Sequence, residues 1–354
     1  MPKELSPKIL VVGLGGIGGI VSAHALRNGF DVTGVTSNLT ILNQLQTHGY
    51  RVSENEKEWT VKGQVFDQCP PELKFDYIFL ATQPTQVEEA ASTVVHLLKK
   101  DGVFVCFQNG LIEARLAKTY GEKRLVGGIV SWGASSTAPG VYLRTAFGGF
   151  TIGRLNGRID DSVRGLLPIL ETIGPIKITE NLPGARWSKL AINCAVSSLG
   201  TISGQNLGAL LRHREARRLA LEIMSETVEV ARTEKIKLSK LVGTIDLDWL
   251  VLTAQDSKGF FKWNLAMKHL MLMLVGLKYR RLRSSMLYAI EKGREPAVDF
   301  LNGEVVQRGK QGNVATPVNK ATAEMIHQIA GKEKFSSMES LIELYRNTRK
   351  PAKS

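Results

Sequence analysis

The first half of the chain alternates short unbroken apolar runs with longer amphipathic segments. The apolar runs predict strands buried on both faces, and the clearest are residues 9–12, 75–81, 102–107 and 125–131. The amphipathic segments predict helices between those strands, at 20–28, 39–45 and 87–98. Strands that alternate with helices in this way favour a doubly wound parallel sheet of the α/β class.

Other segments depart from this alternation. Residues 50–64 are polar and predict a hairpin, while 140–144 and 149–153 predict antiparallel strands joined by turns. From about residue 181 onward the apolar positions follow a helical period, and no segment predicts a strand. We therefore expect an α/β domain at 1–180, followed by an all-helical domain at 181–354 that ends in a short basic tail.

The first predicted strand runs directly into a glycine-rich turn with a complete GxGxxG pattern, and a helix follows the turn. In this context the first glycine permits a tight turn, the second lets the backbone approach a pyrophosphate, and the third lets helix and strand pack closely. The helix N-terminus offers N–H groups and partial positive charge to phosphates. The pattern predicts a Rossmann-type dinucleotide site, formed by Gly13, Leu14, Gly15, Gly16, Ile17 and Gly18.

The residues after the second predicted strand, 31–35, distinguish between the two nicotinamide dinucleotides. An acidic side chain there would accept a hydrogen bond from the ribose 2′-OH of NAD. This chain instead has Thr36, Ser37 and Asn38, small donors that carry no charge to repel a 2′-phosphate, although no arginine is present to bind one. We expect NADP as the cofactor.

Two further strand ends carry polar residues. Thr82 and Gln83 follow the strand at 75–81, and ligands gather at the carboxyl ends of strands in an open parallel sheet, so both are candidate cofactor contacts. Asn109 follows the strand at 102–107 and is a candidate for the same reason. Asn-Gly is also typical of a simple turn, so two interpretations of Asn109 stay open.

The net charge of the chain indicates which class of binding partner to expect. Lys and Arg number 46 against 33 Asp and Glu, which gives a formal net charge of +13. This surplus suits anionic partners such as a dinucleotide phosphate or a carboxylate substrate, although a basic exterior can also be merely solvated. The sequence contains no basic segment with interleaved aromatic residues, which is the pattern that would indicate nucleic-acid binding. A small anionic molecule is therefore the expected partner.

The cysteines indicate a compartment. Only three are present, Cys69, Cys106 and Cys194, and they form neither a CxxC motif nor a disulfide framework. With no signal peptide at the start, they predict a cytoplasmic protein. The most apolar later segment, 269–277, is too short to span a bilayer, so we expect a buried helix there. Neither a membrane partner nor a metal is expected.

The helical half opens with a candidate catalytic face. Lys189, Asn193 and Ser197 are spaced by four residues, so they share one face of a predicted helix. A lysine on a mostly apolar helix, next to an amide and a hydroxyl, suits general-acid catalysis. The alternative is a lysine at the helix edge whose ammonium group simply reaches water. The residue pattern alone leaves both interpretations open.

Taken together, these motifs resemble the ketopantoate reductase (2-dehydropantoate 2-reductase) family over about residues 8 to 330. The segments that carry the resemblance are 13–18, 108–110, Lys189 with Asn193, 283–287, 293–294, 299–303 and 316–319. The resemblance implies a Rossmann domain, a helical domain, an active site in the cleft between them, and a homodimer. It also implies NADPH-dependent reduction of ketopantoate to pantoate, a step of pantothenate biosynthesis.

The resemblance also implies roles for individual residues. Lys189 matches the family's proton donor, and Asn193 would hydrogen-bond the substrate or position the lysine. Ser285 matches the serine that binds the substrate carboxylate, and Asn109 would lie near both nicotinamide and substrate. Ser197 stands where the family has a second asparagine, and we count it among the substrate-binding candidates.

Some positions differ from the family pattern. Ala297 stands where a glutamate is common, Ser37 stands where an arginine is usual, and 240–278 contains extra residues. These differences keep two alternatives open. One is a reductase of another branched 2-keto acid or of an imine, and the other is an NADPH-binding sensor without turnover. The basic run at 278–283 is expected to be a solvated helix end.

Overall fold

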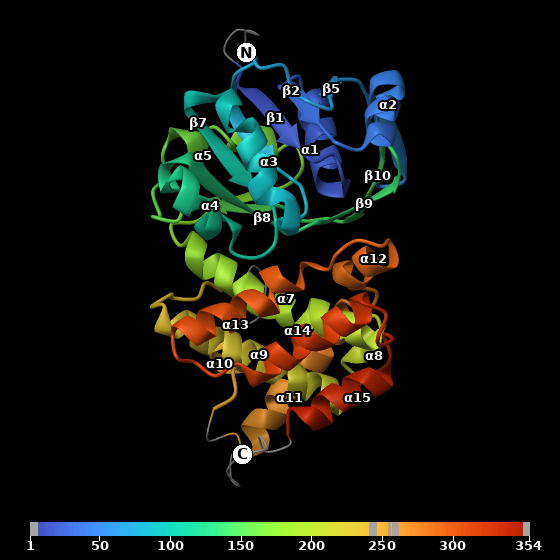
Figure 1. The fold of residues 1–354 in the computed structure, drawn as a ribbon, viewed down its shortest axis with the longest axis vertical. Coiled ribbons are helices and arrows are strands. Elements are labelled where there is room, and N and C mark those ends of the chain that lie inside the picture. The colour runs from blue at the N-terminus through green and yellow to red at the C-terminus, as the bar shows by residue number, and fades with distance from the viewer. Residues whose placement is uncertain (1–5, 241–245, 254–255, 257–261, 350–354) are drawn as a thin grey trace. The chain divides into compact units, whose positions relative to one another are not determined.

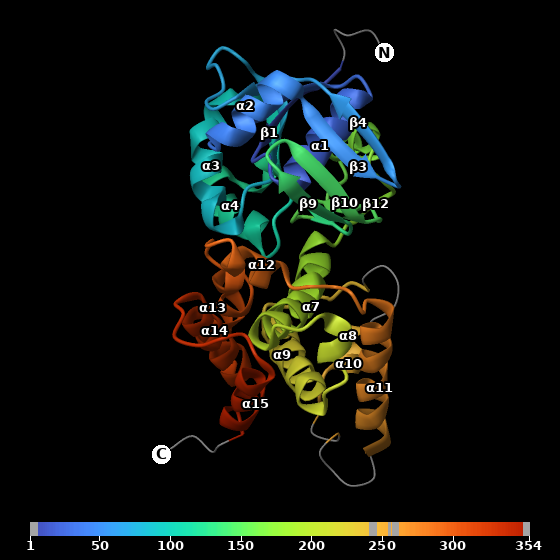
Figure 2. The ribbon, with the colours of Figure 1, turned by 90° about the vertical axis from the view of Figure 1, so that its right-hand side faces the viewer.

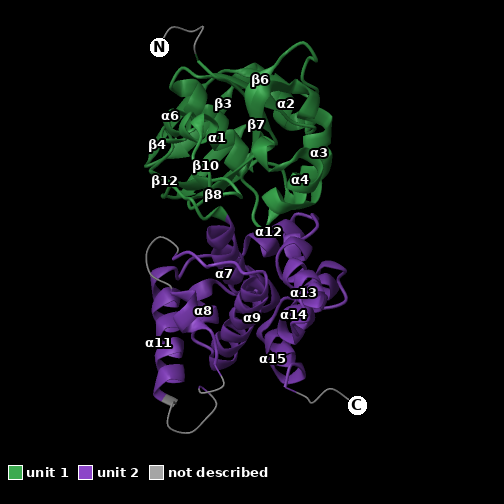
Figure 3. Cartoon of the chain, turned by 90° about the vertical axis from the view of Figure 1, so that its left-hand side faces the viewer, with its two compact units in different colours: residues 1–182 green, residues 183–354 purple. Residues whose placement is uncertain are grey.

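The computed structural model describes residues 6–240, 246–253, 256 and 262–349. The chain divides into two compact units, Met1–Leu182 and Pro183–Ser354, called unit 1 and unit 2 below (Figure 3). The basic tail expected at the C-terminus lies at 350–354, outside the described residues.

Unit 1 is built on an eight-stranded sheet with the order β12-β11-β8-β7-β6-β1-β2-β5. Its strands are β1 (Lys8–Val12), β2 (Asp31–Val35), β5 (Gln64–Phe66), β6 (Phe75–Leu80), β7 (Leu98–Cys106), β8 (Leu125–Val130), β11 (Phe150–Gly153) and β12 (Ile176–Ile178). The core from β5 to β8 is entirely parallel and has the strand order of dinucleotide-binding folds. Only β8 and β11 pair antiparallel. The expected α/β sheet is confirmed.

Helices cover both faces of this sheet. They are α1 (Gly16–Arg27), α2 (Leu39–His48), α3 (Val87–Val94), α4 (Ile112–Tyr120), α5 (Asp161–Arg164) and α6 (Leu167–Leu170). In Figure 3, α1 and α6 lie on one side of β6 and β7, and α3 and α4 lie on the other. The strands between them are almost wholly apolar and buried, as a sheet covered on both faces requires.

A smaller sheet packs beside the glycine turn, with the order β4-β3-β10-β9. It contains β3 (Tyr50–Glu54), β4 (Lys57–Val61), β9 (Gly133–Ala138) and β10 (Val141–Ala146). The antiparallel pair β3–β4 confirms the predicted hairpin. The tyrosine rings of Tyr50 and Tyr142 stack beneath the turn, and the Tyr142 hydroxyl donates to the carbonyl oxygen of Leu14 at 3.0 Å.

One strand prediction was wrong. The segments 140–144 and 149–153 do not pair with each other, because β10 joins the small sheet and β11 joins the large one. β10 pairs with β3 and β9, whereas β11 pairs with β8 and β12. Both strands contribute to the same core, but the Tyr142 hydroxyl donates to Leu14 beneath the glycine turn, whereas Phe150 pairs with Val130 of β8.

Unit 2 is helical, and its described residues contain no strand (Figure 2). Its helices, labelled in Figure 1, are α7 (Leu182–Ser203), α8 (Leu207–Leu210), α9 (Arg214–Thr233), α10 (Leu247–Leu250), α11 (Lys262–Lys278), α12 (Ser285–Glu291), α13 (Asn302–Gln311), α14 (Pro317–Ala330) and α15 (Met338–Asn347). The prediction of an all-helical second half is confirmed for the part of the chain that is described.

A buried polar network connects four of these helices. The amide nitrogen of Asn302 donates to the side-chain oxygen of Asn319 at 2.9 Å, and Ser198 on α7 donates to Asn302. Asn319 in turn donates to the carboxylate of Glu226 on α9, which also accepts the backbone N–H of Val318. Burial raises the pKa of Glu226. The two motifs at 299–303 and 316–319 therefore hold the inner face of α7 in place.

The apolar segment 269–277 does not form the buried helix that we expected. It belongs to α11, on which Leu270, Met273, Leu274 and Leu277 are 41–63% exposed. Only one stripe of the helix packs inward, where Gly276 meets Leu211 near α8. None of the described helices combines the length and apolarity needed to cross a bilayer.

Candidate functional site

The glycine turn after β1 is shaped by close backbone contacts. Gly13 has φ +93°, and a Cβ added there would lie 2.8 Å from the backbone nitrogen of Thr82. A Cβ at Gly18 would lie only 1.9 Å from the carbonyl oxygen of Gly13. Both positions require glycine because the turn folds back tightly against the end of β6 and the start of α1.

Gly15 is different, because a Cβ there would meet nothing within 4 Å. It is the N-cap of α1, where no side chain caps the helix and no acidic residue occupies the first turn. The N–H groups at this helix end are therefore left to a ligand, and the open space above Gly15 fits a pyrophosphate. Leu14 contributes backbone only, since its side chain is buried in the core.

The three residues after β2 have distinct environments. Thr36 is buried, and its hydroxyl accepts the backbone N–H of Asn38 at 3.3 Å. Asn38 is the N-cap of α2, because its side-chain oxygen accepts from the N–H of Ile41 at 3.0 Å. Ser37 between them is exposed. Of the three predicted cofactor residues, Ser37 is the one whose side chain points to solvent without a local structural role.

The strand order places the glycine turn and the ends of β2 and β6 at the same edge of the large sheet. β1 lies between β2 and β6, where the direction of strand succession reverses, and such switch points bind ligands. At the end of β6, the buried Thr82 hydroxyl lacks a hydrogen-bond partner within the described structure. Gln108 donates to the Thr82 carbonyl at 3.2 Å. Gln83 and Asn109 are exposed at the ends of β6 and β7. These residues fit a dinucleotide at the carboxyl edge of the sheet.

In unit 2, Lys189, Asn193 and Ser197 are all half-buried along one side of α7. The opposite side of the helix is buried completely, for example at Cys194 and Ser198, which face the polar network around Asn302. Burial also raises the pKa of the Cys194 thiol, so this cysteine stays protonated. The predicted face is therefore the outer side of a helix anchored firmly on its inner side.

The N-terminus of α12 is tied to the same helix. The Ser284 hydroxyl donates to the carbonyl oxygen of Ser197 at 2.8 Å and lies 2.8 Å from the hydroxyl of Thr201. It also caps α12 by accepting the N–H of Leu287. The next residue, Ser285, is exposed. Ser285 thus follows a residue that is bonded to the Ser197 end of the face, and Ser197 is roughly 12 Å along the axis of α7 from Lys189.

The sequence did not distinguish Ser284 from its neighbour. Ser284 is buried and structural, and a serine directly before an apolar helical segment is the usual signal of an N-cap. Gln108 was likewise not singled out, although its amide fixes the end of β6. Nothing in the local pattern reveals that contact, because its two partners are separated by 26 positions.

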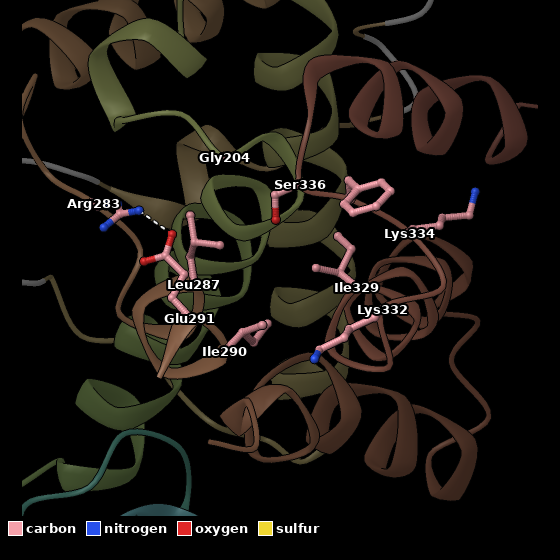
Figure 4. Close-up of a pocket in the computed structure, with 10 residues that line it drawn as sticks. Gly204, Arg283, Leu287, Ile290, Glu291, Ile329, Lys332, Lys334 and Ser336 are labelled. Carbon is pink, nitrogen blue, oxygen red and sulfur yellow. Dashed lines mark hydrogen bonds and ion pairs between the residues drawn. The ribbon is translucent and has the colours of Figure 1, made fainter. Parts of the chain in front are cut away.

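A cavity of about 360 Å³ lies on the side of α12 that faces away from Ser285 (Figure 4). Leu287, Ile290 and Ile329 form apolar walls, and Arg283 at the rim is paired with Glu291. Lys332 reaches toward Ile290 in Figure 4. Ser285 does not line this cavity, so the predicted carboxylate-binding serine and the cavity belong to different faces of α12.

Two family descriptions match the chain. "Ketopantoate reductase PanE/ApbA" covers residues 9–157, and "Ketopantoate reductase PanE/ApbA C terminal" covers residues 181–330. The chain belongs to the ketopantoate reductase family. It is therefore an oxidoreductase of the ketopantoate reductase type, as the resemblance implied.

Curated members of the ketopantoate reductase family match the chain at low identity. The 2-dehydropantoate 2-reductase of Pyrococcus abyssi (strain GE5 / Orsay) is 25% identical over 315 residues, covering 88% of this chain and 94% of that protein. The enzyme of the same name from Lactococcus lactis subsp. lactis (strain IL1403) is 22% identical over 326 residues, covering 90% and 97%.

Solved structures share the fold. A ketopantoate reductase from Ralstonia eutropha JMP134 superposes with a TM-score of 0.77 at 21% identity, covering 93% of this chain and 100% of that one. D-mandelate dehydrogenase with NADH and anilino(oxo)acetate also has a TM-score of 0.77, at 22% identity, covering 92% and 98%. Solved structures with this two-part fold therefore include both a ketopantoate reductase and a D-mandelate dehydrogenase.

Proposed function

We propose that this chain is an NADPH-dependent 2-dehydropantoate 2-reductase, acting in the cytoplasm in pantothenate biosynthesis. The observation that carries the proposal is the face of α7, where Lys189 and Asn193 lie half-buried on a helix anchored from behind. The open glycine turn at Gly15 supports the cofactor. Under this proposal, residues 1–180 form the NADP-binding domain and residues 181–354 form the substrate domain.

The chemistry requires a hydride and a proton. When bound, a nicotinamide cofactor would supply the hydride that reduces the keto carbon. Negative charge then develops on the keto oxygen, and the Lys189 ammonium group can stabilise it electrostatically. Lys189 next donates a proton from Nζ, which completes the alcohol and leaves a neutral amine that water reprotonates. Asn193, one helical turn along α7, hydrogen-bonds the substrate or positions the lysine.

The remaining candidates bind rather than react. Ser285 donates a hydrogen bond from its hydroxyl to the substrate carboxylate. The hydroxyl of its neighbour Ser284 is instead bonded to Ser197 on α7. Ser197 lies beside the same contact and adds a hydroxyl to the substrate site. Asn109 contacts both cofactor and substrate from the end of β7. Thr82 and Gln83 contact the cofactor from the end of β6.

A different 2-keto acid or imine is the second candidate substrate. Two observations favour it: Ala297 replaces the glutamate that is common in the family, and the shared fold includes D-mandelate dehydrogenase. The third candidate, a non-catalytic NADPH sensor, would retain the glycine turn and make Lys189 dispensable.

Steady-state oxidation of NADPH against a panel of 2-keto acids and cyclic imines tests these alternatives. We expect the highest kcat/KM with 2-dehydropantoate. A higher kcat/KM with another substrate would contradict the assignment and establish the second candidate. NADPH binding without turnover on any of the compounds would establish the sensor.

We further propose that the protein is a homodimer that pairs through α11. The exposed residues Trp263, Met267, Leu270, Leu274 and Leu277 repeat at steps of four and three, which is the spacing of a coiled-coil seam. Trp263 is 79% exposed, and such a continuous apolar stripe is unusual on a monomer surface. A second copy of α11 fits the stripe because a two-fold pair buries the same residues from both chains.

Sedimentation velocity measures this directly. We expect the wild type to sediment with twice the mass of one chain, and Leu274→Glu to sediment as a monomer, because the charge would be buried in the seam. Phe335→Glu is the matched control, since Phe335 is 83% exposed but lies outside α11. A monomeric wild type, or a Leu274→Glu variant that stays dimeric, would contradict the proposal.

A further inference from the structure

A second cavity in unit 2 has three arginines among its six lining residues. Its volume is about 210 Å³, and its lining residues are Arg214, Arg218, Leu265, His269, Tyr345 and Arg349. We call it the arginine pocket. It lies where α9 packs against α11 and α15, helices that Figure 2 shows on either side of α9. It shares no residue with the proposed catalytic face on α7 or with the glycine turn.

The arginine pocket carries more positive than negative charge. Glu222 is paired with Arg218 at 2.7 Å and with Arg349 at 2.9 Å. Arg214 makes no hydrogen bond or ion pair to any residue that the structure describes. Three guanidinium groups therefore line a small cavity beside a single carboxylate. Guanidinium groups that line one small cavity repel one another, and a bound anion offsets that repulsion.

His269 lines the same cavity, and its hydrogen bond to Arg217 fixes which ring nitrogen carries the proton. The Nε of Arg217 donates to the Nδ1 of His269 at 3.3 Å, and since a guanidinium can only donate, Nδ1 is the acceptor. The ring proton of neutral His269 is then on Nε2. Arg217 is itself fixed, because its terminal nitrogen donates to the carbonyl oxygens of Leu211 and Arg212.

The charge state of His269 supports this picture. Burial, together with the nearby Arg217, Arg214 and Arg218, lowers the pKa of His269 to about 4. Arg349 and Tyr345 line the same cavity from α15 and the residues that follow, and Glu222 is the carboxylate that pairs with Arg218 and Arg349. The ring is therefore neutral at pH 7, and it offers an uncharged N–H beside the cationic groups.

We propose that the arginine pocket is a binding site for the phosphate group of a small phosphorylated molecule. A phosphate dianion matches several guanidinium groups at once, because arginine donates paired N–H groups to oxyanions. The volume is below that of sites for drug-sized ligands, so the pocket takes a phosphate with only a few further atoms. The unpartnered Arg214 and the Nε2 of His269 are its donors.

Titration with inorganic phosphate tests the site in the full-length protein. The rings of its six histidines are labelled with ¹³C and followed by NMR at constant ionic strength, and the His269 signal is assigned by its loss in His269→Gln. We expect phosphate to shift the His269 ring signals and to raise the pKa of His269 well above about 4, because the anion offsets the surrounding guanidinium charge.

Matched variants and a second anion complete the test. We expect Arg214→Gln to weaken phosphate binding by at least about tenfold. Arg212→Gln, an exposed arginine two positions away that does not line the pocket, should leave binding unchanged. Acetate should bind at least about tenfold more weakly than phosphate. The proposal is overturned if phosphate leaves His269 unaffected, if Arg214→Gln binds like the wild type, or if acetate binds equally well.

Discussion

Replacing Lys189 with alanine should lower turnover of the best keto-acid substrate by about 10²–10⁴-fold, the range that general-acid catalysis contributes. Because the charge on the keto oxygen develops mainly in the transition state, kcat and kcat/KM should fall together. Lys189→Arg separates the two roles of the lysine. An arginine keeps the positive charge but does not release a proton at neutral pH, so it should recover only part of the lost rate.

Lys320→Ala is the control for this substitution. Lys320 lies on α14 of the same unit, its side chain is 67% exposed, and it pairs with Glu324 across one helical turn. The same chemical change there should leave turnover within a few-fold of the wild type. Cofactor titration and thermal unfolding should show both variants folded and able to bind NADPH. Wild-type turnover in Lys189→Ala would exclude the lysine as proton donor.

Ser37→Asp should reverse the cofactor preference. A carboxylate at the end of β2 repels a 2′-phosphate and accepts a hydrogen bond from a free 2′-OH. We expect the ratio of NADPH to NADH affinity to fall by about 100-fold, equivalent to about 2.7 kcal/mol. The fold should tolerate the change because Ser37 is exposed, whereas Thr36 is buried and Asn38 caps α2.

Ser37→Asn isolates the effect of charge, because an asparagine side chain has nearly the same shape as an aspartate side chain but is neutral. Equilibrium binding of both cofactors to the wild type and the two variants measures the change. The wild type should bind NADPH more tightly than NADH, and Ser37→Asn should keep that order. Equal affinities in the wild type would refute the NADP assignment, and an unchanged ratio in Ser37→Asp would place the 2′-position away from Ser37.

Much of the fold was predictable because its signals are local. Continuous apolar runs identified β1, β6, β7 and β8, since strands covered on both faces are apolar throughout. The glycine spacing located the turn before α1, and the structure gives a steric reason for Gly13 and Gly18, while it leaves open space beside Gly15. The four-residue spacing of Lys189, Asn193 and Ser197 placed them on one side of α7. Helical periodicity fixes which residues share a face without reference to the rest of the chain.

Other features depend on partners far apart in sequence. The strands at 141–146 and 150–153 join different sheets, although a short segment separates them, because each finds its partner elsewhere. The apolar α11 looked like core, but whether a helix is covered depends on what packs against it. Ser284 and Ser285 are adjacent and chemically identical, and only the contact between Ser284 and α7 separates a structural serine from a candidate ligand-binding one.

The sequence by itself determined the class of the protein, namely a glycine turn between strand and helix, a helical second half and a lysine on a defined helix face. The tertiary structure alone decided which of these residues remain available for ligands. It buried Thr36 and used Asn38 as a cap, and it joined Asn302, Asn319 and Glu226 behind α7. It also brought Arg349 to Glu222 across 127 positions to form the arginine pocket. Contacts over such separations depend on how whole helices pack, which no local pattern of residues encodes.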